Sequence, residues 1–300
     1  MIIVIGSINL DLITTVNRLP SPGETVSGTR FHTAPGGKGA NQALAAARAG
    51  SPVRMIGAVG HDAFAGEALA LLKASSADLT GVRTVEEPTG TALILVDAKG
   101  ENIIAVTAGA NGRVDEDDLR ACAIGKGDVV LLQHEIPLPT VDAALRAAND
   151  AGAVSILNTA PFRAEAADLL PLASIVVANE TEFALYAEAL ALAGATLAQR
   201  MESFVEQTRR TLIVTLGGEG ALAQTPDGAL TVPSLAIEPV DTVGAGDTFC
   251  GVLAAGLHDG VSLDQALRRA AVAGALACLK PGAQPSIPTR AEIDTAMSGS

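Results

Sequence analysis

The feature that most constrains the fold is an alternation of short apolar runs with alanine- and leucine-rich segments of helical period, which begins near residue 53. This alternation is typical of βα units around a parallel sheet. Several of the runs are apolar throughout, as expected for strands with both faces covered. We therefore predict an α/β protein with strands at residues 2–5, 53–58, 129–133, 154–157, 175–178 and 212–216. Two of the helices between them should stop at Gly50 and Gly152, because glycine often ends a helix.

The composition narrows the class of partner. The chain has 300 residues and a formal net charge of -13, which would repel nucleic acid and anionic membranes. A small-molecule ligand is therefore expected. The three cysteines show neither a CxxC spacing nor a disulfide framework, which fits a reducing cytoplasm. The N-terminus lacks a secretory signal, and the apolar stretches reach about half of the ~20 residues that a membrane span requires.

Two stretches, at about 12–33 and 91–108, interrupt the alternation and have no obvious helical partners. In the second, "TALILVD" and "NIIAVT" flank a Lys-Gly turn and have the composition of a β-hairpin. We interpret the two stretches as a small β appendage that could cover a site or form an interface. The alternative is an edge hairpin of the main sheet.

Polar residues follow most of the predicted strands, at the carboxyl edge where open α/β sheets bind ligands. They are Asn9, Asp11, Glu135, Asn158, Asn179, Glu182, Thr215, Gly217 and Gly218. Any one of them could be a turn or cap residue. Together they indicate a site for a polyhydroxylated ligand and a metal, because carboxylate and amide oxygens suit both hydroxyl donors and Mg²⁺.

The stretch "DTVGAGDTF", residues 241–249, passes from a loop into an amphipathic helix. Gly244, Ala245 and Gly246 would leave backbone N–H groups open at the helix start, where the helix dipole favours an anion. The next residue, Asp247, is then either a cap of the helix or the base of a phosphoryl transfer.

The stretch "PGGKGANQ", residues 35–42, is a second glycine-rich turn that leads into a helix. It is not a phosphate-binding Walker loop, because Gly39 follows Lys38 where Ser or Thr is required. Lys38 and Asn41 could point at a substrate, or Lys38 could lie in solvent. The match "GEGALA", residues 218–223, precedes a strand, a turn and another strand, which argues against a dinucleotide-binding oxidoreductase.

Several motifs together resemble the ribokinase-like family of sugar and nucleoside kinases, also called the phosphofructokinase-B type. They are "GSINLD", "GGKGANQ", "NETE", "TLGGEGA", "DTVGAGDTF" and "PGAQPSIP", in the order and approximate spacing of that family. The resemblance covers nearly the whole chain and is weaker from Phe183 to Arg210. It implies one three-layer, doubly wound kinase domain over residues 1–300, in which the β appendage is a lid over the sugar and a homodimer interface.

The resemblance also implies roles for individual residues. Asp247 would deprotonate a primary hydroxyl, and Gly244, Ala245 and Gly246 would form the anion hole. The sugar would be held by Asn9, Asp11, Gly37, Lys38, Asn41 and Glu135. ATP would be bound by Asn179, Thr215, Gly217, Gly220 and Gly246, and Mg²⁺ through Asn179 and Glu182. A K⁺ site would use Asp241, Val243, Ala277, Lys280, Gly282 and Ser286.

The expected activity is ATP-dependent phosphorylation of a sugar primary hydroxyl, with D-ribose as the favoured substrate. Aromatic residues make up only 2% of the chain, so a stacked nucleobase acceptor is less expected. Deoxyribose, fructose, adenosine and pseudouridine stay open as substrates. A non-catalytic sensor of sugar or nucleotide is the alternative from another class.

Overall fold

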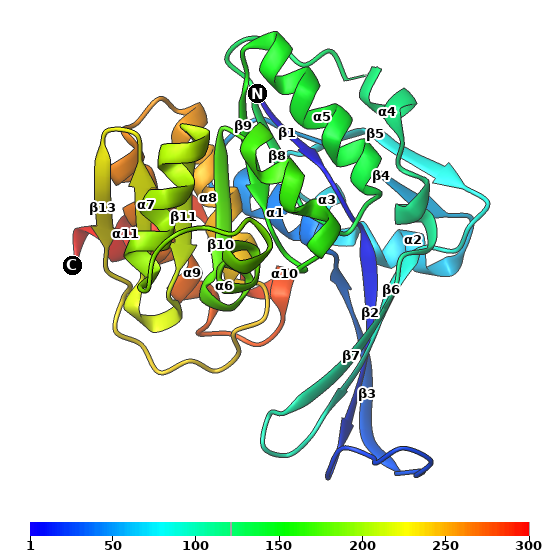
Figure 1. Ribbon diagram of the computed structural model, residues 1–300. Coiled ribbons are helices and arrows are strands. Elements are labelled where there is room, and N and C mark those ends of the chain that lie inside the picture. Colours follow the sequence, from blue (N-terminus) through cyan, green and yellow to red (C-terminus); the bar gives the residue numbers. More distant parts are fainter. Residues whose placement is uncertain (121, 300) are drawn as a thin grey trace.

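The computed structural model describes residues 1–120 and 122–299. Its main sheet runs from edge to edge in the order β13, β12, β11, β10, β9, β8, β1, β4, β5 (Figure 1). The strands from β11 to β5 are parallel, and β12 and β13 are antiparallel additions at one edge. Their bounds are β1 Ile2–Ile5, β4 Val53–Gly60, β5 Asp78–Val85, β8 Val129–Leu132, β9 Val154–Asn158, β10 Ile175–Asn179, β11 Thr211–Thr215, β12 Ala221–Thr225 and β13 Gly228–Val232.

The apolar strands separate two cores, because successive side chains of a strand point to opposite faces. In β1, Ile2 and Val4 join the core on one face, whereas Ile3 and Ile5 join the core on the other. All four side chains are buried. This is why the central strands read as uninterrupted apolar runs rather than as alternating ones.

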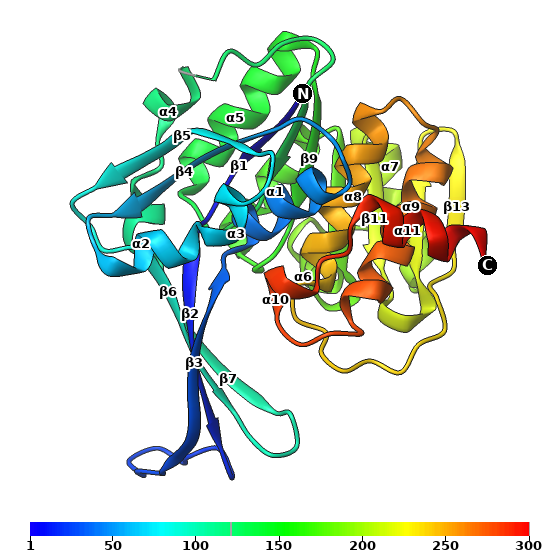
Figure 2. The same cartoon turned by 180° about the vertical axis from the view of Figure 1, so that it is seen from behind.

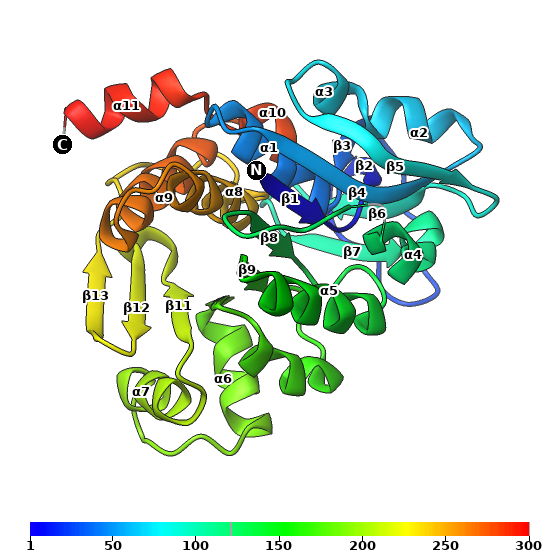
Figure 3. The same cartoon turned by 90° about the horizontal axis from the view of Figure 1, so that it is seen from above.

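Helices cover both faces of the main sheet, which gives the predicted three layers (Figure 3). One face packs against α1 Lys38–Arg48, α2 Ala63–Ala68, α3 Ala70–Lys73, α8 Ala245–His258, α9 Leu263–Ala277 and α11 Arg290–Ser298. The other packs against α4 Glu116–Arg120, α5 Leu138–Ala151, α6 Glu180–Ala189 and α7 Leu197–Thr208. The short helix α10 (Ala283–Ser286) and the 3-10 turns Gly109–Arg113, Ala164–Leu172 and Gly217–Glu219 complete the described elements.

A second sheet of four strands projects away from the main body (Figures 1 and 2). Its order is β3 (Gly28–Gly36), β2 (Asn9–Val16), β6 (Gly90–Val96) and β7 (Asn102–Thr107). The predicted hairpin is therefore β6 and β7, and the alternative that it edges the main sheet is wrong. The first part of this sheet is longer than the predicted stretch 12–33, because β2 already starts at Asn9 and β3 continues to Gly36.

One strand of the main sheet, β5, escaped the sequence analysis. Its sequence, "DLTGVRTV", is an edge strand of mostly half-buried residues and has no continuous apolar run. The two helix stops lie close to where they were predicted. Gly152 is the left-handed C-cap of α5, and α1 ends at Arg48, two residues before Gly50. The stretch "GEGALA" leads into the antiparallel strands β12 and β13, as predicted.

Within the described residues, no helix is long and apolar enough to cross a bilayer. The cysteines Cys122, Cys250 and Cys278 are free and buried. Both findings agree with the sequence-based expectations.

Helices α1 and α8 cross closely beside the carboxyl edge of the sheet. A Cβ added to Gly251 of α8 would overlap the backbone oxygen of Gln42 and would lie 2.6 Å from the Cβ of Ala45 on α1. Contact at this distance leaves no room for a side chain, so only glycine fits. The crossing brings the first turn of α8 against the first turn of α1.

We predict that Gly251→Ala lowers the free energy of unfolding by about 1–3 kcal/mol, because the helices must move apart to admit the methyl group. Urea unfolding at equilibrium measures the change. Gly66→Ala is the matched control, because an added Cβ at Gly66 in α2 would meet nothing within 4 Å. That variant should be more stable by about 0.5–1 kcal/mol. Equal effects of the two substitutions would contradict the close crossing.

Candidate active site

In the first turn of α8, the N–H groups of Gly246 and Asp247 have no hydrogen-bond partner among the described residues, whereas the Ala245 N–H donates to the Thr242 carbonyl at 3.3 Å. Gly244 is the N-cap with φ 78°, and no side chain caps the helix. A Cβ on Gly244 would lie 2.9 Å from the Cα of Ala283, so the left-handed turn also needs the small residue. Because the helix is 14 residues long, its dipole places partial positive charge at Ala245 and Gly246. This end of the helix can bind an anion.

The carboxylate of Asp247 lies in the same turn and is bound by two amides of α1. Its Oδ2 accepts a hydrogen bond from Asn41 Nδ2 at 2.8 Å, and its Oδ1 accepts one from Gln42 Nε2 at 2.9 Å. Asp247 is only 7% exposed. The alternative that Asp247 caps its own helix is therefore wrong.

A polar cavity of about 220 Å³ lies in front of Asp247. Residues from several strand ends and from α1 meet there, as the parallel sheet predicts. The predicted residues that line it are Lys38, Asn158, Asn179, Glu182, Thr215, Gly244, Gly246 and Asp247.

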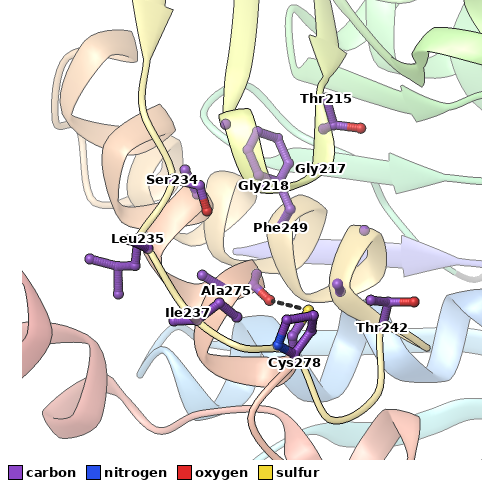
Figure 4. Close-up of a pocket in the computed structure, with 17 residues that line it drawn as sticks. Thr215, Gly217, Gly218, Ser234, Leu235, Ile237, Thr242, Phe249, Ala275 and Cys278 are labelled. Atoms are coloured by element: carbon purple, nitrogen blue, oxygen red, sulfur yellow. Dashed lines mark hydrogen bonds between the residues drawn. The ribbon is translucent and has the colours of Figure 1, made fainter.

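An adjoining cavity of about 290 Å³ is mostly apolar (Figure 4). Thr215, Thr242 and Gly246 line both cavities, so the two meet at the start of α8. Leu235, Ile237 and other apolar residues of the loop after β13 line the second cavity opposite the glycines that follow β11. Of the predicted nucleotide-binding residues, Thr215, Gly217, Gly220 and Gly246 lie here, whereas Asn179 lies only in the polar cavity.

The "GGKGANQ" turn is built around Glu135 and Ser7. Glu135 Oε2 accepts the Ser7 hydroxyl at 2.5 Å and the Lys38 N–H at 3.0 Å. Gly37 has φ 86°, and a Cβ on Gly39 would lie 2.5 Å from the Ser7 nitrogen, so both positions require glycine. The tight turn thereby joins the end of β1 to the start of α1.

Lys38 faces the site and not the solvent. Burial acts to lower the pKa of its ammonium, but the carboxylates of Asp247, Glu135 and Glu182 outweigh burial and raise the pKa. Lys38 is therefore a fixed positive charge among acidic groups. Such a cation can bind an anionic or hydroxylated ligand that enters the polar cavity.

Asp11 projects from β2 over Gly36, where an added Cβ would lie 2.5 Å from both carboxylate oxygens. Burial, with the nearby charges of Glu135 and Asp247, raises the pKa of Asp11 to about 7. Carboxylates held this close to one another favour a ligand that donates hydrogen bonds or carries a cation. A polyol supplies such donors.

Two asparagines complete the ligand side of the site. Asn9 is buried, and its Oδ1 accepts a hydrogen bond from Asn111 Nδ2 at 2.7 Å. In Asn41, Nδ2 binds Asp247, but Oδ1 is buried without a hydrogen-bond partner among the described residues. An unpaired buried acceptor beside the carboxylate is a position where a ligand hydroxyl would restore a lost hydrogen bond.

Comparison with known proteins agrees with this geometry. Residues 1–290 match the pfkB family carbohydrate kinases. The ribokinase of Bacillus subtilis is 38% identical, over 99% of each chain. The crystal structure of ribokinase from Thermotoga maritima superposes with a TM-score of 0.91 at 30% identity and covers 99% of each chain. Arabidopsis thaliana ribokinase, solved as a complex with ribose and ATP, has a TM-score of 0.87 at 32% identity, over 100% of this chain and 99% of its own.

The chain belongs to the pfkB family of carbohydrate kinases. The fold predicted from its motifs is thereby confirmed, and so is the class of enzyme, a sugar kinase. The roles of individual residues stay predictions.

The resemblance to the kinase family assigns Asn179 and Glu182 to Mg²⁺, and their amide and carboxylate oxygens are ligands that suit this ion. Asn179 and Glu182 form a capping box at the start of α6, and Glu182 Oε2 also accepts the Thr159 hydroxyl at 3.2 Å. Among the described residues, no group of three or more His, Cys, Asp or Glu could hold a metal. One or two protein ligands are enough for Mg²⁺, because this ion keeps several waters and also binds substrate phosphates.

Hydrogen bonds link the segments that carry the residues assigned to K⁺. Asp241 joins the loop before α8 to the loop before α10, because its oxygens accept the N–H groups of Val243 at 3.0 Å and Gly282 at 2.8 Å. The buried hydroxyl of Ser286 donates to the Ala283 carbonyl at 2.8 Å. A carboxylate, a hydroxyl and nearby carbonyls are oxygen ligands, which fits a hard cation. Ala277 and Lys280, which would contribute their carbonyls, lie on either side of Cys278, whose carbonyl accepts the Asp241 N–H at 3.2 Å.

Three residues that support the site were not predicted from the sequence: Gln42, Ser7 and Asn111. Gln42 and Ser7 stand inside the recognised stretches "GGKGANQ" and "GSINLD", so a signal was present for both. Asn111 had none, because it lies in a 3-10 turn about 100 residues after its partners Ile8 and Asn9, and no motif marks it. His134 directly precedes Glu135 in the chain. Burial lowers the pKa of its imidazole to about 4, so the ring is neutral near pH 7.

We predict that Asp11→Asn stabilises the unliganded protein, and more so at high pH. The folded pKa of about 7 lies above the ordinary value of 3.8, so ionising this carboxyl opposes folding. The cost is absent below pH 3.8 and grows until the pH passes 7. The stabilisation measured by urea unfolding should be larger at pH 8 than at pH 5 by about 2–3 kcal/mol.

Glu188→Gln, on the exposed side of α6, is the control and should show no such difference. An equal gain at both pH values for Asp11→Asn would show that the folded protein does not oppose ionisation of this carboxyl.

Proposed function

We propose that this kinase transfers the γ-phosphoryl group of ATP to the primary hydroxyl of D-ribose and forms D-ribose 5-phosphate and ADP. The observation that carries the proposal is the position of Asp247. Its carboxylate lies in the polar cavity, in the first turn of α8, beside the open N–H groups of that turn. A base next to an anion site is what phosphorylation of an alcohol requires.

In the proposed reaction Asp247 accepts the proton of the ribose 5-hydroxyl. The hydroxyl oxygen then bonds to the γ-phosphorus, and the bond from that phosphorus to the β–γ bridging oxygen breaks. The bridging oxygen keeps the electron pair and leaves with ADP. The N–H groups of Gly244, Ala245 and Gly246 would stabilise the charge that develops on the phosphoryl oxygens, by a few kcal/mol for each donor.

Ribose would bind between the small sheet and α1. Asn9, Asp11, Asn41 and Glu135 would accept its hydroxyls, and Lys38 would donate to them. The unpaired Oδ1 of Asn41 supports this placement, since a hydroxyl donor is missing there. Gly37 and Gly36 leave room for the sugar because neither carries a side chain.

ATP would lie across the two cavities. Its base would occupy the apolar cavity past Gly217 and Gly220, and its phosphates would pass Gly246 toward Asn179 in the polar one. Mg²⁺ would be held by Asn179 and Glu182 through its waters and would neutralise phosphate charge. K⁺ would be held near Asp241, with the carbonyls of Val243, Ala277, Lys280 and Gly282 and the hydroxyl of Ser286.

A second sugar or nucleoside acceptor is less well supported. Hydroxyl acceptors dominate the ligand side of the site, and they would be left unpaired by a substrate that lacks a matching hydroxyl. This argument disfavours deoxyribose in particular. A non-catalytic sensor would not need a carboxylate held beside an anion site, so the amides on Asp247 favour an enzyme.

We predict that the purified protein releases ADP when given ATP, Mg²⁺ and D-ribose, and that Asp247→Asn lowers kcat by at least about 100-fold. The loss of a general base accounts for the decrease, whereas binding of ribose and ATP should persist. A coupled assay of ADP release measures kcat, and calorimetry measures binding.

The same assay is run with deoxyribose, fructose, adenosine and pseudouridine, and with K⁺ replaced by a larger organic cation. Faster turnover of another acceptor would overturn ribose as the substrate. An unchanged kcat for Asp247→Asn would remove this residue from the mechanism.

We also propose that the small sheet is the lid of the sugar site and the interface of a homodimer, in the cytoplasm. Large apolar side chains are exposed on it, namely Phe31, Leu93, Ile103, Ile104 and Val106. Phe31 is 64% exposed and Val106 is 55% exposed. A single chain seldom leaves such a patch in water unless it binds a partner.

We predict that the wild-type protein sediments as a dimer and that the double variant Leu93→Lys/Ile104→Lys sediments as a monomer. Leu93 and Ile104 point to opposite faces of the sheet, because Ile104 pairs with Ile94, the neighbour of Leu93. The double variant therefore places a charge on each face. Sedimentation velocity is the measurement, and Leu185→Lys on α6 is the control that should stay dimeric. A monomeric wild type, or a dimeric double variant, would refute this interface.

A further inference from the structure

The carboxylate of Asp247 stands at the end of a row of buried amides. Gln133 Nε2 donates to Gln42 Oε1 at 2.6 Å, and Gln42 Nε2 donates to Asp247 Oδ1 at 2.9 Å. Both glutamines are fully buried. The row thus links the segment after β8 to α1, and α1 to the start of α8.

We propose that Gln42, oriented by Gln133, is a positioning residue that fixes the carboxylate of Asp247 for proton transfer. This inference rests on the proposed function, because it gives Gln42 its role through the base. Gln42 itself touches Asp247 and not the substrate. The argument depends on the direction in which each amide points.

The charge of Asp247 sets that direction. An ionised carboxylate only accepts hydrogen bonds, so the NH₂ group of Gln42 must face Asp247. The Oε1 of Gln42 then faces Gln133 and requires a donor, which turns the NH₂ group of Gln133 toward it. No other arrangement of the two amides lets Gln42 donate to Asp247 and also accept a hydrogen bond from Gln133.

The second hydrogen of the Gln42 amide is also used. Gln42 Nε2 donates to Asn158 Oδ1 at 3.3 Å, and Asn158 Nδ2 donates to the Val177 carbonyl at 3.3 Å. Each polar atom of the Gln42 side chain therefore has a partner. A side chain bound at both ends and buried on all sides has one orientation available, so it can hold the carboxylate in one plane.

An unpaired atom marks the far end of the row. Gln133 Oε1 is buried and has no hydrogen-bond partner among the described residues, although burying an unpaired acceptor is ordinarily unfavourable. Gly6 faces this oxygen, and a Cβ at Gly6 would overlap it. The unpaired oxygen follows from the direction of the row, because the Gln133 NH₂ group is committed to Gln42. We infer that the protein tolerates this cost in return for a fixed base.

Asn41 holds the other oxygen of Asp247, but it does not replace Gln42. Its Nδ2 binds Oδ2, and its own Oδ1 is left free for a ligand. One hydrogen bond leaves a carboxylate able to rotate about its Cβ–Cγ bond, whereas two bonds to different oxygens define its plane. The charges of Lys38 and Asp11 interact with that of Asp247, and Lys38 and Glu182 line the polar cavity with it.

The test replaces Gln42 with leucine, which has a similar volume and no donor. We expect kcat for D-ribose to fall about 10–100-fold while the KM for ribose and for ATP changes less than about threefold, because misorientation of the base affects chemistry more than binding. Thr140→Val is the matched control. It removes one buried hydrogen bond, to the Val114 carbonyl, and Thr140 lines neither of the two site cavities. It should lower stability without lowering kcat.

A double-mutant cycle identifies the path. Gln133→Leu should lower kcat in the wild-type background and should have little further effect in the Gln42→Leu background, because Gln133 acts only through Gln42. A crystal structure of unliganded Gln42→Leu gives a readout that does not depend on turnover. In it the Asp247 carboxylate should be rotated or present in more than one orientation.

Three outcomes would overturn the inference: an unchanged kcat for Gln42→Leu, multiplicative effects of the two substitutions, or an Asp247 carboxylate that keeps its plane in the variant. Failure of the proposed function looks different. In that case the wild-type protein would not phosphorylate ribose, whereas the rotated carboxylate of Gln42→Leu would still be seen and would support the positioning role.

Discussion

The site depends on the close crossing of α1 and α8. Because Gly251 lets the two backbones touch, Asn41 and Gln42 at the start of one helix reach Asp247 at the start of the other. The sheet then places the polar strand ends around this crossing. The helix start that can bind an anion and the carboxylate that can accept a proton are thus parts of one turn. Proximity of this kind is the main source of catalysis in phosphoryl transfer.

The electrostatics of the site follow from its acidic residues. The positive charge of Lys38 interacts with Asp247, Glu135 and Glu182, whereas Asp11 is repelled by Glu135 and Asp247. Such a site disfavours its own ionisation, as the raised pKa of Asp11 shows. Hydroxyl donors and a bound cation relieve this repulsion, and in the proposed reaction ribose and Mg²⁺ supply them. The excess of acidic groups therefore makes the site complementary to ligands that donate hydrogen bonds or carry a cation.

The central strands of the main sheet could be predicted because each is a continuous apolar run in the sequence. The ligand-binding edge could be predicted because polar residues directly follow these runs. Edge strand β5 was missed since a half-buried strand with an internal glycine has neither signal. Asn111 and the link from Gln133 to Gln42 were missed for another reason. They are contacts between residues more than 90 positions apart, and nothing in the sequence shows which amides meet. Asp247 could be recognised as important from its glycines, but only its hydrogen bonds to Asn41 and Gln42 excluded a helix cap.

The central claim is that Asp247 is the base for the ribose hydroxyl. The most direct measurement is a crystal structure of the protein with D-ribose, Mg²⁺ and a non-hydrolysable ATP analogue. The account predicts an Asp247 oxygen about 2.6–3.2 Å from the ribose 5-hydroxyl, with that hydroxyl facing the γ-phosphorus at the start of α8. A 5-hydroxyl bound by another group, with Asp247 still engaged only by Asn41 and Gln42, would contradict it.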